Sequence, residues 1–252
     1  MSQHLCNMLD LAPGHVNLSE IEQTLSRPNV DVSCPTKESA NNHTPIHRCI
    51  AKGHVKVLPM LIEQWPVGRS FPKAAKGVTP LLICCQLSEH IGSSTRRVCS
   101  AEQLCDMAQQ LLDKDPDTID AAEKNGWTPL MTVAEFGCKP LLDLLLEHGA
   151  NVHLADAKGL TALHWACCGA GVPPGKDSRQ STEFPDVIAL LIAAGARLDV
   201  EDLRKETPLM LAPTHPVIPA VQAALRGVWG APLVEPRPAL RRAFLLPRCL
   251  PK

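Results

Sequence analysis

Residues 128–131 read Thr-Pro-Leu-Met, and related tetrapeptides that recur along the 252-residue chain decide its fold. Four further copies start at Thr44, Thr79, Thr161 and Thr207. The steps between successive copies are 35, 49, 33 and 46 residues. A single repeat of about 33 residues, lengthened twice by an insertion, accounts for all four steps.

Each tetrapeptide has the composition of a helix start. Threonine accepts hydrogen bonds from the free amides at a helix N-terminus, and proline suits the first helical position. After Thr128 a second apolar stretch follows at 141–146, and Gly149 stands where a helix would end. The same order recurs with 187–192 and Gly195. The chain is therefore expected to consist of repeated pairs of helices.

The composition agrees with a helical fold. The chain is 45% hydrophobic and 20% charged, which is typical of a folded protein. It has four Trp, four Phe and no Tyr, fewer aromatic residues than a β-sandwich or barrel normally uses. A helical core of small residues is favoured, and four of the 23 prolines start the repeated helices.

The repeated units resemble the ankyrin repeat family over roughly residues 40–212. This resemblance implies an all-α solenoid of helix-turn-helix units with projecting β-hairpin fingers and a concave binding face. About five repeats are expected. Residues 18–25 look like the second helix of an N-terminal half-repeat.

Three regions are predicted along the chain: an N-terminal segment (1–15), an ankyrin repeat domain (16–230) and a basic, proline-rich tail (231–252). The tail has five basic residues and one acidic residue, although the whole chain has a net charge of −1. The two insertions, at about 86–103 and 169–183, are polar and rich in helix breakers. They are expected to form surface loops between the two helices of a unit.

No catalytic motif is recognisable. The chain has no glycine-rich phosphate loop, no nucleophile elbow and no Cys-x-x-Cys pair. In the family, the histidine at the fourth tetrapeptide position (His47, His164) ties the turn by hydrogen bonds. We expect no enzymatic activity, no catalytic residues, no cofactor and no metal site, and we interpret the acidic run 113–120 as a solvated edge.

The 11 cysteines suggest a reducing compartment. Four of them are expected to be inert core thiols (Cys49, Cys84, Cys85 and Cys167), and Cys99 and Cys105 to be more accessible. No secretory signal is recognisable, and the longest apolar run, 187–196, is about half the length of a membrane helix. We expect a monomer in the cytoplasm and/or nucleus that binds neither nucleic acid nor membranes.

The resemblance also implies which residues meet a partner. Positions that would line the concave face carry Val78, Leu87, Trp127, Phe136 and Leu160, and the fingertips carry Lys124, Asn125, Lys158 and Arg204. An apolar centre with a polar rim is typical of protein-binding sites, and Trp127 is the best hot-spot candidate. The alternative is that Trp127 and Phe136 pack against neighbouring fingers or an inserted loop.

The predicted function is a non-enzymatic protein–protein interaction module: an adaptor, scaffold or regulatory subunit that presents a concave ankyrin groove. Two alternatives remain open. The chain could recruit substrates to a ubiquitin ligase, because 241–250 faintly resembles a SOCS box, although the Leu-Cys-Arg element is absent. It could also be a ligand-binding or catalytic protein whose inserted loops build a pocket.

Overall fold

The computed structural model describes residues 2–11, 15–27, 32–33, 42–66, 68–90, 99–170 and 184–211. The α-helices within these residues are α1 (Ser2–Leu9), α2 (Leu18–Leu25), α3 (Pro45–Ala51), α4 (Leu58–Glu63), α5 (Pro80–Gln86), α6 (Ala101–Lys114), α7 (Pro129–Phe136), α8 (Lys139–Glu147), α9 (Ala162–Ala170) and α10 (Phe184–Ala193). Short 3₁₀ turns are η2 (Ala75–Gly77), η3 (Leu87–His90), η4 (Pro116–Thr118) and η5 (Pro208–Leu211).

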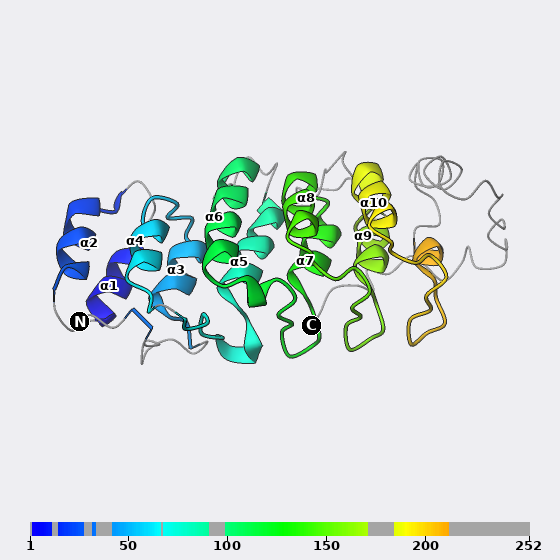
Figure 1. The fold of residues 1–252 in the computed structure, drawn as a ribbon, viewed down its shortest axis with the longest axis horizontal. Coiled ribbons are helices and arrows are strands. Elements are labelled where there is room, and N and C mark those ends of the chain that lie inside the picture. The colour runs from blue at the N-terminus through cyan, green and yellow to red at the C-terminus, as the bar shows by residue number, and fades with distance from the viewer. Residues whose placement is uncertain are drawn as a thin grey trace.

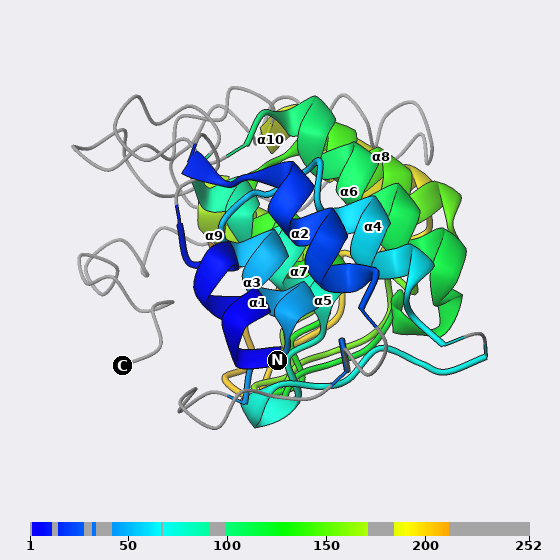
Figure 2. The same ribbon diagram turned by 90° about the vertical axis from the view of Figure 1, so that its left-hand side faces the viewer.

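The helices form two parallel rows. In the inner row each helix packs on the next in the order α1, α3, α5, α7, α9 and η5. The outer row runs α2, α4, α6, α8, α10, and each outer helix packs on the inner helix that precedes it in the chain. Figure 1 shows the pairs stacked along one axis, and Figure 2 shows the rows end-on. The expected all-α ankyrin-repeat solenoid is confirmed.

The N-terminal unit is more complete than the sequence analysis predicted. Helix α2 covers the expected residues 18–25, and Asn17 accepts a hydrogen bond from the Glu20 amide at its start. Helix α1 lies within the segment 1–15, packs against α3 and α2, and buries Leu5 and Leu9 completely. The half-repeat is thus a full pair, and the boundary placed at residue 16 falls too late.

Each insertion is shorter than expected, because a helix extends into one end of the predicted range. Helix α6 already begins at Ala101, because Ser100 and Gln103 cap its start through reciprocal hydrogen bonds of 3.2 and 2.9 Å. Helix α9 continues through Gly169 to Ala170. The remaining parts of the insertions, 91–98 and 171–183, and the tail lie outside the described residues.

The acidic run 113–120 is not uniformly solvated. Asp115 is only 5% exposed, and its Oδ2 accepts a hydrogen bond of 2.7 Å from the amide of Phe71. Asp120 Oδ1 accepts a hydrogen bond of 2.9 Å from the amide of Asn151. These two carboxylates join neighbouring units, so the interpretation as a solvated edge is wrong for them.

Candidate functional site

Threonine and proline start the inner helices α3, α5 and α7, as the sequence predicts. Thr79 and Thr128 have extended backbones, and their hydroxyls accept hydrogen bonds from the amides of Leu82 (3.2 Å) and Met131 (3.3 Å). A proline follows at the first helical position in both helices. The start of each helix fixes where the chain leaves the preceding finger, and so where that finger points.

The fingers are tight hairpins that share one pattern of backbone hydrogen bonds. In the finger 123–127, the Glu123 amide donates to the Trp127 carbonyl (3.0 Å), and the Gly126 amide donates to the Glu123 carbonyl (2.9 Å). The fingers 74–78, 156–160 and 202–206 repeat both bonds. The fourth residue of each has a positive φ: Gly77, Gly126, Gly159 and Lys205, at 81°, 83°, 81° and 65°. Glycine suits this position because it has no Cβ.

Hydrogen bonds between fingertips join these four hairpins into one row. The amide of the first tip residue donates to the carbonyl of the second tip residue in the preceding finger. The pairs are Lys124 N to Lys76 O (2.7 Å), Ala157 N to Asn125 O (2.8 Å) and Leu203 N to Lys158 O (3.0 Å). The finger row is therefore held in register by backbone bonds, and Figure 1 shows its loops projecting on one side of the helices.

The side chains of the two tetrapeptide histidines, His47 and His164, also link each helix start to the next finger. His47 Nδ1 accepts a hydrogen bond from the Thr44 amide (3.3 Å), and its Nε2 lies 3.3 Å from the carbonyl of Val78 in the next finger. His164 makes equivalent contacts with Thr161 (3.1 Å) and Glu206 (3.3 Å). Burial lowers the pKa of His47 to about 4 and lowers that of His164, so both rings are neutral at pH 7. Both histidines have the structural role that the resemblance implied.

An aromatic pair lies at the base of the central fingers. The ring of Trp127 meets that of Trp165 edge-on, with centroids 4.4 Å apart and an interplanar angle of 65°. Lys158 Nζ lies 5.8 Å from the centroid of Trp165. Trp165 is fully buried, whereas Trp127 is half-buried. Sequence reasoning missed Trp165, although its place directly after His164 could have drawn attention to it.

The five apolar residues predicted to line the groove do not gather in one place. Val78, Trp127 and Leu160 lie at the finger bases, whereas Leu87 and Phe136 lie at the opposite ends of the inner helices. The eight residues of α7 place the finger bases about 12 Å from the opposite ends of the inner helices. Leu160 is 6% exposed and belongs to the core, so its prediction as a contact residue is wrong. Val78, Leu87 and Trp127 are half-buried and packed against the core, and Phe136 is half-buried.

The four polar fingertip residues are exposed and lie on adjacent fingers (Lys124, Asn125, Lys158 and Arg204). Two further cations, Lys73 and Lys76, are exposed on and beside the finger 74–78. Sequence reasoning left both out of the candidate site, although Lys76 occupies the same tip position as Lys158. The structure thus brings together a row of basic side chains along the finger row.

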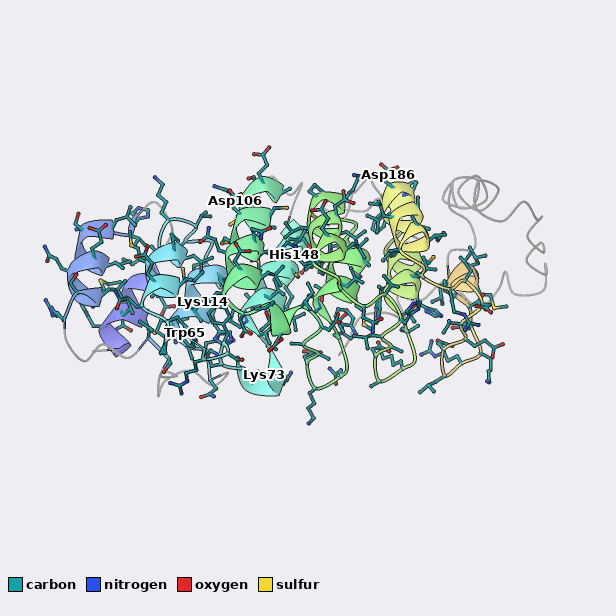
Figure 3. All side chains as sticks on the ribbon, viewed as in Figure 1. Trp65, Lys73, Asp106, Lys114, His148 and Asp186 are labelled. Atoms are coloured by element: carbon teal, nitrogen blue, oxygen red, sulfur yellow. The ribbon has the colours of Figure 1, made fainter. Side chains whose placement is uncertain are left out.

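The charge on the outer helices has the opposite sign. Their exposed carboxylates include Glu20, Glu22, Glu63, Glu102, Asp106, Asp113, Glu147 and Asp186. In Figure 3, Asp106 and Asp186 lie at one side of the stack and Lys73 lies on the finger side. The solenoid therefore has a basic finger edge and an acidic helical edge.

The thiols and carboxylates of the described residues form no recognisable catalytic centre. Burial raises the pKa of Cys6 to about 11 and that of Cys167 to about 12, and it raises those of Cys84 and Cys85. Protonated, buried thiols are poor nucleophiles. Cys99 is also buried, contrary to the expectation of access. Within the described ranges, no group of three or more His, Cys, Asp or Glu residues could hold a metal ion.

One hollow of about 360 Å³ lies outside the finger row. It is lined by Val152, His153, Thr161, Arg197 and Val200. These residues come from the segments between α8 and α9 and after α10, not from the two insertions. The predicted pocket between the insertions involves 91–98 and 171–183, which lie outside the described residues. Among the helices that the structure describes, none combines the length and the apolar character needed to cross a membrane.

Comparisons with known proteins point to one family. Residues 97–172 match the model of ankyrin repeats in three copies. The chain is 27% identical over 139 residues to "Neurogenic locus notch homolog protein 1" of Homo sapiens, and 31% identical over 129 residues to "B-cell lymphoma 3 protein homolog" of Mus musculus. These matches cover 55% and 51% of this chain but 5% and 26% of the relatives, so the similarity is limited to a part of each relative.

A solved structure extends the similarity to most of the chain. An ankyrin repeat domain from Acinetobacter baumannii AYE superposes with a TM-score of 0.65, covering 86% of this chain and 95% of that one. The two sequences are 20% identical, so the likeness concerns the fold alone.

Proposed function

Because the chain belongs to the ankyrin repeat proteins, we propose that it is a non-enzymatic interaction module that presents its concave, finger-bearing side to a partner protein. It would act as an adaptor, scaffold or regulatory subunit, and as a monomer. The partner surface would comprise the fingertips, with Lys124, Asn125, Lys158 and Arg204, and the half-buried Trp127 and Val78 at the finger bases.

The finger row is the observation that supports this proposal most strongly. Backbone hydrogen bonds of 2.7–3.0 Å join four hairpins, so their exposed side chains are held in fixed positions relative to one another. A preordered surface loses little conformational entropy on binding. Nine cysteines of the described residues are free thiols, which favours a reducing compartment such as the cytoplasm or nucleus.

Site-specific photocrosslinking in cells tests the proposal. A benzophenone amino acid placed at Asn125, an exposed fingertip, is expected to yield discrete covalent adducts with a partner protein. The matched control carries the same group at Asp106, which is exposed on outer helix α6. Adducts found at Asp106 and absent at Asn125 would place the partner on the wrong side of the solenoid and contradict the proposal.

A further inference from the structure

The basic side chains of the finger row form one continuous surface. We call Lys76, Lys124, Lys158 and Arg204 the fingertip ridge; each is exposed at the tip of one of four consecutive fingers. Lys73 lies one residue before the first of these fingers and extends the same charge. The backbone bonds between tips fix the order and spacing of these cations.

The ridge cations have no internal counter-ions. In the part of the chain that the structure describes, some cations outside the ridge pair with carboxylates, as Lys139 does with Asp143 (2.8 Å) and Lys205 with Glu201 (3.2 Å). No ion pair involves any of the four ridge residues among the same described residues. Their charge is therefore available to a ligand without breaking an existing pair.

Two of the four acidic residues in these fingers, Asp156 and Asp202, are buried, whereas Glu123 and Glu206 are half-buried. Asp156 is 7% exposed, and its Oδ1 accepts hydrogen bonds from the amides of Lys158 (2.8 Å) and Leu160 (2.9 Å). Asp202, also 7% exposed, accepts bonds from Arg204 (2.7 Å) and Glu206 (2.9 Å) in the same way. Both carboxylates stabilise the turns that carry the ridge cations, and neither is exposed beside them to attract a basic ligand.

The spacing of the ridge suits an extended chain. Neighbouring inner helices pack about 10 Å apart, so successive fingertips repeat at about that distance. A polyproline II helix has three residues per turn and rises about 9.3 Å per turn. A segment of this conformation with a carboxylate at every third residue presents one negative charge to each finger, and about ten residues span the four fingers.

We propose that the fingertip ridge binds an extended acidic segment of a partner protein, with Asp or Glu at every third position. This inference rests on the proposed function and specifies the chemistry of the partner. The acidic outer helices repel such a segment, so the two edges of the solenoid orient it toward the fingers. The half-buried edge of Trp127 lies at the base of the central fingers and offers an apolar contact.

Fluorescence anisotropy with labelled synthetic peptides tests the inference on the full chain. The probe is a peptide of about twelve residues made of Pro-Ala-Glu repeats. A second peptide has the same composition with all glutamates adjacent, and a third carries phosphoserine in place of glutamate. The probe is expected to bind most tightly of the three, with an affinity that falls as salt is added.

A pair of charge-matched variants locates the binding. The ridge variant K76Q/K124Q/K158Q/R204Q is expected to bind the probe about tenfold more weakly or worse, since it removes all four exposed cations that would pair with the peptide's carboxylates. The control variant R27Q/K56Q/R69Q/K114Q has the same net charge, with all changes outside the ridge, and is expected to bind as the unchanged protein does. Circular dichroism verifies that both variants are folded.

Several outcomes would overturn the inference. Equal losses in both variants would mean that net charge alone attracts the peptide. Equal binding of the clustered peptide would contradict the spacing, and preferred binding of the phosphoserine peptide would assign the ridge to phosphorylated partners. If no peptide binds while Asn125 still crosslinks to a partner, the inference fails and the proposed function stands.

Discussion

The α3–α5 junction and the α7–α9 junction join equivalent inner helices by different means. Between α3 and α5, the ring of His47 reaches the carbonyl of Val78 in the next finger. Between α7 and α9, Met131 occupies the histidine position. Close packing takes over there, through the Trp127–Trp165 pair and a near contact of Gly169 with the Glu135 carbonyl. The repeat thus specifies a geometry that either a titratable hydrogen bond or close packing can maintain.

The difference has a consequence for how each junction can be disrupted. A junction held by a buried neutral imidazole is sensitive to protons, whereas a junction held by close packing is sensitive to added volume. Changes to volume at Gly169 and Gly126, to protonation at His47 and to the aromatic pair at Trp127 therefore separate the two mechanisms.

Replacing Gly169 by Ala is expected to have the largest effect on the α7–α9 junction. A Cβ at this position would lie 2.1 Å from the Glu135 carbonyl oxygen and 2.7 Å from Cε1 of Phe184. We expect the free energy of unfolding to fall by about 3 kcal/mol or more, as for severe overpacking. Urea denaturation measures it.

The sign of the change in unfolding free energy tests whether α7 and α9 approach this closely. Gly169 lies inside helix α9, where helix propensity alone makes Ala more stable than Gly by about 1 kcal/mol. An unchanged or increased stability of Gly169→Ala would mean that α7 and α9 do not approach as closely as the structure describes.

Acidification is expected to weaken the α3–α5 junction. The pKa of His47 is about 4 in the folded chain and close to 6.5 when unfolded. The unfolded chain therefore binds the proton first, so the stabilisation is complete above pH 6.5 and is lost progressively as the pH falls toward 4. The shift corresponds to at most about 3 kcal/mol.

The variant His47→Leu isolates this contribution, because Leu82 stands at the same position in the next repeat. The difference in unfolding free energy between the original chain and the variant, measured by urea denaturation from pH 7.5 to pH 4, is expected to shrink as the pH falls. Parallel curves would show that His47 does not carry the pH dependence.

Replacing Gly126 by Ala is expected to loosen the contact between the fingers 123–127 and 156–160. The backbone has a φ of 83°, and a Cβ would lie 2.9 Å from the Cα of Asp156. Left-handed backbone costs a non-glycine residue about 1–2 kcal/mol, and the contact adds to it, so we expect a loss of about 2 kcal/mol or more.

Gly149→Ala is the matched control, since Gly149 has a φ of 81° and a Cβ there would meet nothing within 4 Å. Thermal denaturation of the two variants separates backbone strain from the clash. Equal losses would mean that the finger-to-finger contact contributes nothing.

The sequence predicts the repeats better than it predicts the surface. Thr-Pro at helix starts and glycine in the finger turns act through local backbone preferences, so both can be recognised along the chain. Lys205 has a φ of 65° without glycine, because the hairpin bonds impose that turn. Helix α1 was missed because it begins without the Thr-Pro signal, and its identity as a repeat helix depends on packing against α3.

The candidate site was only partly predictable for the same physical reason. The exposed fingertips depend on the local hairpin, and Lys124, Asn125, Lys158 and Arg204 are exposed as expected. Exposure at the finger bases depends on how the neighbouring unit packs. Trp127 extends to the surface, whereas the smaller Leu160 is covered, although both precede the threonine of their repeat. Spacing alone cannot distinguish them.

Replacing Trp127 by Leu is expected to have the smallest effect on stability, and it tests whether the residue that packs α7 against α9 also contacts the partner. Loss of the edge-on contact with Trp165 is expected to lower the unfolding free energy by about 1 kcal/mol. Because half-buried Trp127 lies at the base of the finger that carries Asn125, the crosslinking yield from Asn125 is expected to fall severalfold at temperatures where the variant remains folded. Phe136→Leu, at the C-terminal end of α7 and away from the fingers, is the control and should leave that yield unchanged. A yield that survives the Trp127 change would assign this residue to packing alone and confine the partner to the fingertip ridge.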